Sequence, residues 1–370
     1  MDHDATTTTV EQPPAVLVLI RDDRLREEVR RVAAAAGRRI AESEAPVGRH
    51  PWSSAPLVVL DTEAAVACST VSPPPRRGGV VTVTDGEPEL ADWQAAAVIG
   101  AEQVIALPGA AVGLIEKFAE YGQPHADGGV VVAVAGAGAG AGASVLAAAT
   151  ALRSAAAGFR PHTVLVDAAP HGGGLDLLLG IEATPGLRWP DLVVDDGRVA
   201  AAELHNALPV AGAGLSVLSC GRGTGRTGPI GAAAVHAVVE AARGAGDLVV
   251  CDISSERGPH TDGILDAADL VVLVVPARLR AVAAAGAAAE WIVRRNPNRG
   301  LVVRGPAPGN LRGRDIAAVL DLPLLAAVRA QPGLAARLER GGMRLRRGPL
   351  RAACDAVLAV LTPPDQRSAG

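Results

Sequence analysis

Aromatic side chains are scarce in this chain, whose 370 residues include four Trp, two Phe and one Tyr. Lysine is scarcer still, because Lys117 is the only one and arginine supplies the other basic side chains. Hydrophobic residues make up 49% of the chain and charged residues 20%, a balance typical of packed rather than disordered proteins. The core must therefore be built mainly from Val, Leu, Ile and Ala. The length is sufficient for two or three domains.

A strong net charge is also absent, because 35 basic side chains stand against 39 acidic ones. No whole-protein field would draw this chain to nucleic acid or anionic lipid, so any such contact must be local. The four cysteines lie far apart and form no CxxC pair, which argues against a zinc site or a disulfide scaffold and favours a reducing compartment. Residues 1–14 are polar and acidic and do not resemble a secretory signal. We therefore expect a cytoplasmic protein.

Short β-branched runs alternate with Ala-rich helical segments along the whole chain. Strands buried on both faces form continuous apolar runs, and this alternation predicts parallel sheets covered by helices. The sequence thus predicts an α/β protein with two doubly wound domains. The runs lie at 16–20, 57–60, 80–84 and 103–107 in the first domain, and at 130–135, 163–166, 215–218, 248–251, 270–275 and 301–303 in the second. We predict a disordered tail at 1–14, a domain at 15–122, a linker at 123–128, a domain at 129–361 and a second disordered tail at 362–370.

A glycine-rich turn follows the first run of the second domain, in VVVAVAGAGAGAGASVLAAA (130–149). Such a turn between a strand and a helix lets backbone N–H groups point at a phosphate. Aligned to the Walker pattern GxxxxGK[ST], the final three positions hold glycine, alanine and serine, so a magnesium-ligating hydroxyl is present and the lysine is missing. The candidate nucleotide-binding residues of this turn are Gly136, Gly138, Gly140, Gly142, Ala143 and Ser144.

Two aspartates follow apolar runs of the same domain. Asp167 ends HTVLVD and Asp252 ends DLVVCD, so both are expected at the carboxyl edge of the sheet, beside the loop. Ser144 and Asp252 are the candidate magnesium ligands, and Asp167 is the candidate catalytic residue. Strand-terminal aspartates also serve as turn formers and helix caps, and that interpretation has about even odds for each residue taken alone.

Several segments together resemble the deviant-Walker ATPases MinD, ParA and the pilus-assembly protein CpaE. They are AGAGAGAGAS (135–144), LVDAAPHGGGLDLLLG (165–180), DLVVCD (247–252) and LVVLVVPARLRAV (270–282). GLRWPDL (186–192), LVVRGPAPGNL (301–311) and RRGPLRAA (346–353) are similar to actinobacterial CpaE-like proteins described as septum site-determining.

The resemblance implies a P-loop NTPase fold, with ATP and magnesium at the loop, Asp167 and Asp176 as switch carboxylates and Asp252 as the Walker B residue. It further implies a homodimer over the nucleotide face. The implied role is regulation of septum placement, or of the localisation of pilus or secretion machinery, through contacts with proteins of those systems.

The departures from that family remove positive charge. The family's signature lysine is replaced by Gly138 and its Walker lysine by Ala143, while Ala169 and Arg304 replace a second switch acid and an adenine-reading asparagine. Losing one preorganised charge stabiliser typically costs about 10² to 10³ in rate. We expect at most a weak ATPase, with ATP and magnesium binding weak or lost. Arg222 and Arg226 are candidate substitute cations, although a solvated loop is the favoured interpretation there.

An alternative keeps the same glycines for another cofactor. Gly138-x-Gly140-x-x-Ala143 also fits G-x-G-x-x-G/A, and Asp167 follows at the distance of a ribose-binding acid, as in an NAD(P)- or FAD-dependent Rossmann oxidoreductase. This alternative leaves LDLLLG and DLVVCD unexplained.

The first domain resembles a response-regulator receiver. Asp22 and Asp23 follow its first run and Asp61 follows its second (57–60), as a phosphoacceptor site with metal-binding acids requires, but Leu107 replaces the lysine that responds to the phosphoryl charge. The favoured interpretation is a pseudo-receiver used for protein contacts, and the alternative is phosphorylation at Asp61.

Arginines gather near the C-terminus, from Arg337 to Arg351. The next helix places Leu350, Cys354, Val357 and Leu361 on one face. Its polar face carries little basic charge, so we expect the helix to pack on its own domain. Peripheral membrane or nonspecific DNA contact through the arginines is not favoured.

Overall fold

The computed structural model describes residues 15–48, 51–52, 55–71, 74, 77–121, 129–192, 201–221, 229–254, 256–305, 311–329, 331–340 and 342–362. The predicted tail at 1–14, the predicted linker at 123–128 and, except for Thr362, the predicted tail at 362–370 lie outside these residues, as do Arg222 and Arg226. The chain divides into two compact units, Met1–Asp127 and Gly128–Gly370. Each contains a parallel or mainly parallel sheet covered by helices, as the alternation of strand and helix patterns predicted.

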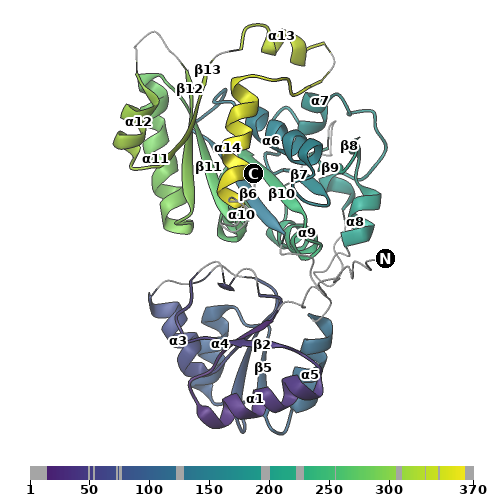
Figure 1. Ribbon diagram of the computed structural model, residues 1–370, viewed down its shortest axis with the longest axis vertical. Coiled ribbons are helices and arrows are strands. Elements are labelled where there is room, and N and C mark those ends of the chain that lie inside the picture. Colours follow the sequence, from purple (N-terminus) through teal and green to yellow (C-terminus); the bar gives the residue numbers. More distant parts are fainter. Residues whose placement is uncertain are drawn as a thin grey trace, which may run out of the picture. The chain divides into compact units, whose positions relative to one another are not determined.

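The first unit contains a five-stranded parallel sheet with strand order β2-β1-β3-β4-β5. Its strands are β1 (Val16–Leu19), β2 (Ile40–Glu42), β3 (Val58–Leu60), β4 (Val80–Asp85) and β5 (Gln103–Leu107). Its helices are α1 (Asp23–Ala35), α3 (Thr62–Val71), α4 (Leu90–Ile99) and α5 (Ala111–Glu120). Helices α1 and α5 pack on one face of the sheet, and α3 and α4 pack on the other (Figure 1).

Strand β1 shows why these strands are continuously apolar. Successive side chains of a strand point to opposite faces. Val16 and Val18 accordingly join the core beneath α1 and α5, whereas Leu17 and Leu19 join the core beneath α3 and α4. Both faces are buried, so neither set of positions can be polar.

The second unit contains an eight-stranded sheet with strand order β13-β12-β11-β6-β10-β7-β9-β8, in which the pairing of β8 with β9 is antiparallel and all other pairings are parallel. Its strands are β6 (Val130–Gly136), β7 (Thr163–Asp167), β8 (Val210–Gly212), β9 (Leu215–Leu218), β10 (Leu248–Ser254), β11 (Leu270–Pro276), β12 (Arg299–Gly305) and β13 (Leu324–Arg329). Its helices are α6 (Ala143–Ala157), α7 (Leu175–Leu179), the 3-10 turn Trp189–Asp191, α8 (Ala201–Ala207), α9 (Ala232–Gly244), α10 (Pro259–Ala267), α11 (Leu279–Arg295), α12 (Gly313–Leu320), α13 (Leu334–Leu338) and α14 (Pro349–Leu361).

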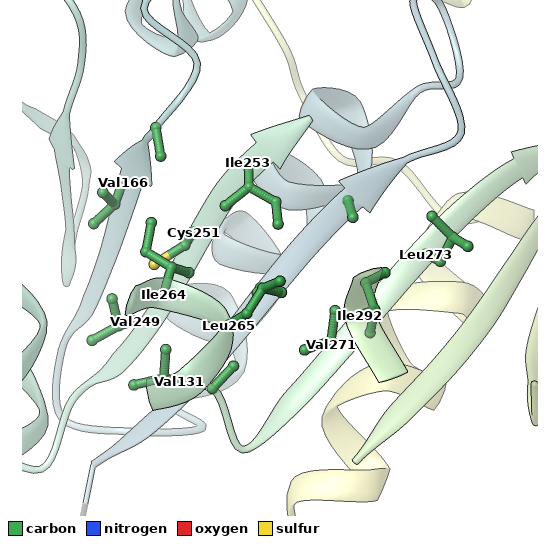
Figure 2. Packing of buried hydrophobic residues seen from close by; sticks show 14 of the residues in the cluster. Val131, Val166, Val249, Cys251, Ile253, Ile264, Leu265, Val271, Leu273 and Ile292 are labelled. Carbon is green, nitrogen blue, oxygen red and sulfur yellow. The ribbon is translucent and has the colours of Figure 1, made fainter. Parts of the chain in front are cut away.

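Aliphatic side chains fill both faces of this sheet. Figure 2 shows one face, where strand residues such as Val131 and Val249 pack with Ile264 of α10 and Ile292 of α11. On the other face, α6 and α14 pack against each other, with α6 on β10 and α14 on β13. Many of the α6 side chains that are buried there are alanines, whose small size allows the helices and the sheet to approach closely. Close packing of alanines thus fills this part of the core without aromatic side chains.

Helix α14 packs its apolar face on the domain, as predicted. Leu350, Cys354 and Val357 are buried in the core with α6, and Leu361 packs against the same cluster. In the described part of the chain, no helix is both long enough and apolar enough to cross a bilayer.

Three strands were not predicted from the sequence. Strands β2, β8 and β13 all lie at sheet edges and are largely exposed, so burial does not impose the apolar pattern by which the others were found. Strands β10 and β12 are both longer than expected. Strand β10 continues past Asp252 to Ser254 through an irregularity in its pairing with β6, and β12 spans Arg299–Gly305 rather than 301–303.

The strand order rules out the Rossmann alternative. In a dinucleotide-binding fold, the strand that carries the ribose-binding acid is the neighbour of the strand that precedes the glycine loop. Here β10 lies between β6, which precedes the loop, and β7, which ends in Asp167. The interpretation as an NAD(P) or FAD enzyme is therefore wrong for this domain.

Candidate functional site

The glycine loop connects the central strand β6 to helix α6. Its glycines adopt backbone angles that disfavour other residues, with φ of 149° at Gly138, 73° at Gly140 and 99° at Gly142. A Cβ atom would meet nothing within 4 Å at Gly138 or Gly140. At these two positions glycine is therefore needed for the backbone conformation, since space is not limiting there.

The loop leaves a row of backbone donors available. Within the described ranges, the N–H groups of Gly138, Ala139, Gly140, Gly142 and Ala143 find no protein acceptor. Helix α6 begins at the end of this row, so the positive end of its dipole adds to them. This arrangement can hold a phosphate or another anion.

Ser144 and Asp252 lie together, on the side of the loop towards β10. The Oγ of Ser144 is 3.1 Å from the Oγ of Ser254, which donates a 2.8 Å hydrogen bond to Oδ1 of Asp252. The backbone N–H of Ser254 donates to the same oxygen at 3.1 Å. Burial raises the pKa of Asp252 above its ordinary value, although hydrogen bonds from both serines oppose that shift. The predicted magnesium pair is therefore adjacent, with its oxygens already hydrogen-bonded within the protein.

Asp167 ends β7 directly beside Asp252 on β10, where the two residues are register partners. It is 2% exposed, and its carboxylate accepts hydrogen bonds from the N–H groups of Ala169 (3.1 Å) and Leu175 (3.0 Å). Burial, together with the charge of Asp252, raises the pKa of Asp167 to about 7. Around neutral pH this carboxyl therefore carries a proton for a large part of the time.

Asp176 lies in the first turn of α7 and is also buried. Its Oδ2 is 3.7 Å from the guanidinium of Arg188, and its Oδ1 accepts a hydrogen bond from the N–H of Leu177. Its charge contributes to the raised pKa of Asp167. All three predicted acids of this domain therefore gather at one edge of the sheet.

Arg304 contacts the loop, which sequence reasoning missed. Its Nη2 donates a 2.8 Å hydrogen bond to the carbonyl oxygen of Gly140. Its Nη1 is 3.2 Å from the point where a Cβ on Gly142 would lie. Arg304 is 164 residues from Gly140 in sequence, so no local spacing could indicate the contact. It arises because β12, β11 and β6 are consecutive neighbours in the sheet.

A hollow of about 570 Å³ opens on this side of the loop. It is bounded by the loop residues, by the segment between β11 and α11, and by Arg304 and Leu311. Of the described residues that line it, three are arginines, Arg278, Arg280 and Arg304, and none is acidic. The two sides of the loop thus differ in charge, with aspartates towards β7 and β10 and arginines towards β11 and β12.

The residues fit the two parts of magnesium-ATP unequally. The open N–H groups and the arginines suit a phosphate chain. The magnesium side fits poorly for two reasons. The Ser144 hydroxyl and the Asp252 carboxylate are already hydrogen-bonded to Ser254, and the pKa values of Asp167 and Asp252 are raised, which disfavours their charged forms. Among the described residues, no cluster of three His, Cys, Asp or Glu side chains could hold a metal ion.

The acids of the first unit have other partners. Oδ2 of Asp61 accepts hydrogen bonds from the N–H groups of Arg21 and Asp22, and Oδ1 accepts one from Ala64 at the start of α3. Asp22 caps α1 by accepting from the N–H of Leu25. In the predicted acidic site, Asp61 and Asp22 therefore already accept hydrogen bonds from backbone N–H groups.

The remaining receiver positions also depart from a phosphoacceptor site. Asp23 is exposed and pairs with Arg26, and Leu107, at the position of the missing lysine, is 1% exposed. A leucine buried in the core provides no cation near Asp61. These contacts support the interpretation as a pseudo-receiver, which remains a prediction.

Comparisons with known proteins agree with both units. The family described as "Rv3660c-like, CheY-like N-terminal domain" matches residues 19–129. "Uncharacterized protein Rv3660c" of Mycobacterium tuberculosis strain H37Rv is 46% identical over 349 residues, which cover 93% of this chain and 97% of that protein. The same figures hold for "Uncharacterized protein MT3760" of strain CDC 1551.

Solved structures resemble the second unit in fold. A ParA family ATPase from Chlorobium tepidum TLS is 16% identical with a TM-score of 0.55, over 63% of this chain and 99% of that one. The septum site-determining protein MinD from Pyrococcus horikoshii OT3, complexed with Mg-ADP, is 14% identical with a TM-score of 0.51, over 63% of this chain and 96% of that one. The second unit therefore has a MinD/ParA-like fold.

Proposed function

Because the chain belongs to the Rv3660c-like family, we propose that it is a MinD/CpaE-like regulator with weak or no ATP hydrolysis. Its task in this proposal is the placement of the septum, or the localisation of pilus or secretion machinery. It acts through contacts with other proteins, including a second copy of itself. ATP and magnesium are at most weakly bound.

One observation carries the proposal: the phosphate loop keeps its shape while the two positions that hold lysine in MinD-type proteins are Gly138 and Ala143. The open N–H groups and the helix end support retention of an anion site. Each missing transition-state cation costs about 3 to 4 kcal/mol of barrier reduction. A glycine loop without these two lysines is better suited to binding and assembly than to ATP hydrolysis.

Septum placement is proposed from similarity of sequence segments and of fold. The segments at 186–192, 301–311 and 346–353 resemble actinobacterial proteins described as septum site-determining. The Pyrococcus horikoshii MinD, whose fold the second unit shares, carries the same description. At 14% identity that likeness supports the fold alone, so the cellular role needs its own test.

The proposed dimer forms over the face that carries the loop. Leu279 begins α11 at the edge of the hollow and is 75% exposed, so it offers an apolar contact on this face. No lysine of this domain can reach across a dimer to a partner's phosphate, because the only lysine of the chain lies in the first unit. We therefore expect the dimer to form without ATP.

The dimer is tested by sedimentation of the full chain with and without ATP and magnesium. We expect the same dimer mass in both conditions and ATP turnover close to background. Leu279→Asp should shift the protein towards monomer, while Val210→Asp, at an exposed residue on edge strand β8, should not. A dimer that forms only with ATP, or rapid hydrolysis, would show that the proposal is wrong.

The cellular role is tested with a fluorescent fusion in a strain that lacks the gene. Septum placement predicts fluorescence at division sites and altered cell length when the protein is depleted or overproduced. Recruitment to pilus or secretion machinery without a change in division would favour the other branch. Diffuse fluorescence with normal division and secretion would contradict both.

Contact with membrane or DNA through Arg337 to Arg351 remains disfavoured. The apolar face of α14, which a membrane-binding helix would need, is buried against α6 and the sheet. Flotation with anionic liposomes and DNA shift assays across a salt series test this, and we expect no binding at physiological salt.

A further inference from the structure

The hollow beside the glycine loop has an unbalanced positive charge. Arg278 and Arg280 come from the segment that leads into α11, and Arg304 comes from β12. In the described part of the chain, none of the three forms an ion pair with a carboxylate. Three cations from two segments therefore converge on one hollow with nothing there to neutralise them.

Arg304 adds to this imbalance, because it lies beside the start of α6. The first turn of a helix carries a positive partial charge, so a cation there is repelled. Among the described residues, the side chain of Arg304 makes one hydrogen bond, to the Gly140 carbonyl. An anion placed between the guanidinium and the open N–H groups would interact favourably with both. The pairing of an arginine with a helix start is thus a second indication of an anion, independent of the glycine loop.

The lining also indicates which part of a ligand is recognised. Apart from the three arginines, the described residues around the hollow are Gly, Ala, Pro and Leu. None of these described residues has a side-chain amide, hydroxyl or carboxylate that could distinguish the hydrogen-bonding edge of one base from another. Recognition must therefore come from charge and backbone donors, which suits a chain of phosphates.

The acidic side of the loop offers a magnesium ion no ready place. Oδ1 of Asp252 accepts two hydrogen bonds from Ser254, whose Oγ is also within hydrogen-bond distance of Ser144. A magnesium ion would have to break this network and compete for its oxygens. The arginines lie on the other side and need no metal to attract phosphate.

We propose that this hollow binds a polyphosphate chain without magnesium, and that Arg304 supplies the positive charge that lysine supplies in related loops. The inference rests on the proposed function, in which the loop survives as a binding element. It goes further in naming the ligand chemistry, which is a di- or triphosphate chain with little dependence on an attached nucleoside. The loop N–H groups hold the phosphates from below, and Arg304 covers them from β12.

Isothermal titration calorimetry of the full chain tests the ligand class. The probes are ATP, GTP and inorganic tripolyphosphate, each in excess magnesium and in EDTA. We expect all three to bind, with affinities within about tenfold of one another. Binding in EDTA should be as tight as in magnesium or tighter, because magnesium neutralises the charge that the arginines recognise. Binding of ATP alone, or binding only with magnesium, would overturn the proposal.

Variants of the arginine test the assignment to Arg304. Arg304→Gln should weaken binding of every probe by about tenfold or more, the effect expected for a charged hydrogen-bond partner. Arg304→Lys should restore part of the loss. Arg294→Gln is the matched control, since Arg294 is an exposed arginine near the end of α11 that pairs with Glu290. Equal affinities in Arg304→Gln and the control would remove Arg304 from the site.

The outcomes separate this inference from the proposed function. If no probe binds the native chain while the nucleotide-independent dimer persists, the ligand inference fails and the proposed regulator stands. If ATP binds only with magnesium and is hydrolysed rapidly, both fail. Thermal unfolding without ligand shows whether each variant is folded, so a loss of binding cannot be mistaken for a loss of structure.

Discussion

The two units carry aspartates at the same place in the same kind of sheet, yet the carboxyls are in opposite situations. Asp61 accepts hydrogen bonds from three backbone N–H groups, and its neighbour Asp22 caps a helix. Asp167 and Asp252 lie side by side on adjacent strands, and the pKa of each is raised by burial. In the first unit the ionised carboxylates stabilise the fold through hydrogen bonds. In the second unit burial disfavours the ionised form of Asp167 and Asp252.

In the first unit, the oxygens of Asp61 accept backbone hydrogen bonds, and Leu107 is buried in the core. In the second unit, the loop keeps donors without partners and retains arginines without carboxylates beside them. These groups are available to a ligand, which agrees with the anion site proposed for the second unit.

The largest change in stability is expected from substitution of Asp61. Asp61→Ala leaves three backbone N–H groups without their acceptor, and it should lower the free energy of unfolding by about 3 kcal/mol or more. Chemical denaturation followed by circular dichroism measures this. Asp23→Ala is the control, because the Asp23 side chain is 92% exposed and should matter little. If the two variants were equally stable, Asp61 would not be a structural residue.

A second prediction concerns the pH dependence of the second unit. The folded-state pKa of Asp167 is raised, so its contribution to stability is fully present below about pH 4 and is lost as the pH rises through about 7. Asp167→Asn should remove this loss of stability with rising pH, which amounts to about 2 kcal/mol or more between pH 5 and pH 8. Asparagine keeps only one of the two accepted hydrogen bonds, so the measurement is the difference between unfolding midpoints at pH 5 and pH 8 within each protein.

Asp321→Asn provides the matched control for that experiment, because Asp321 is an exposed acid of the same unit. It should retain the slope of the native chain. An unchanged slope in Asp167→Asn would mean that the carboxyl is ionised over the whole range and that burial is not felt there.

The smallest expected effect is at the predicted phosphoacceptor. Incubation with acetyl phosphate and magnesium should produce no appreciable adduct at Asp61, because both of its oxygens accept backbone hydrogen bonds and no lysine lies at position 107. Intact-protein mass spectrometry measures the product. A stoichiometric adduct would return the first unit to the class of working receivers and would remove the contrast with the second.

Strands that are buried on both faces were predictable, because burial alone makes them continuous apolar runs. Edge strand β13, with the sequence LLAAVR, was not, since those residues also suit a helix and the strand exposes much of its surface. The juxtaposition of Asp167 and Asp252 followed from the order of strands in the sequence, and the family resemblance added Asp176. The hydrogen bonds between Asp252 and Ser254 and the raised pKa of Asp167 could not be predicted, because they depend on side-chain placement and burial in the folded domain.

The order of residues along the chain determined the two α/β units, the position of the glycine loop and the absence of lysine from it, because these depend on local pattern and composition. Only the tertiary structure decided which charges meet at that loop. Arg304 reaches Gly140 because β12, β11 and β6 are neighbours in the sheet, and a cation so distant in sequence becomes a local one only when the strands have paired.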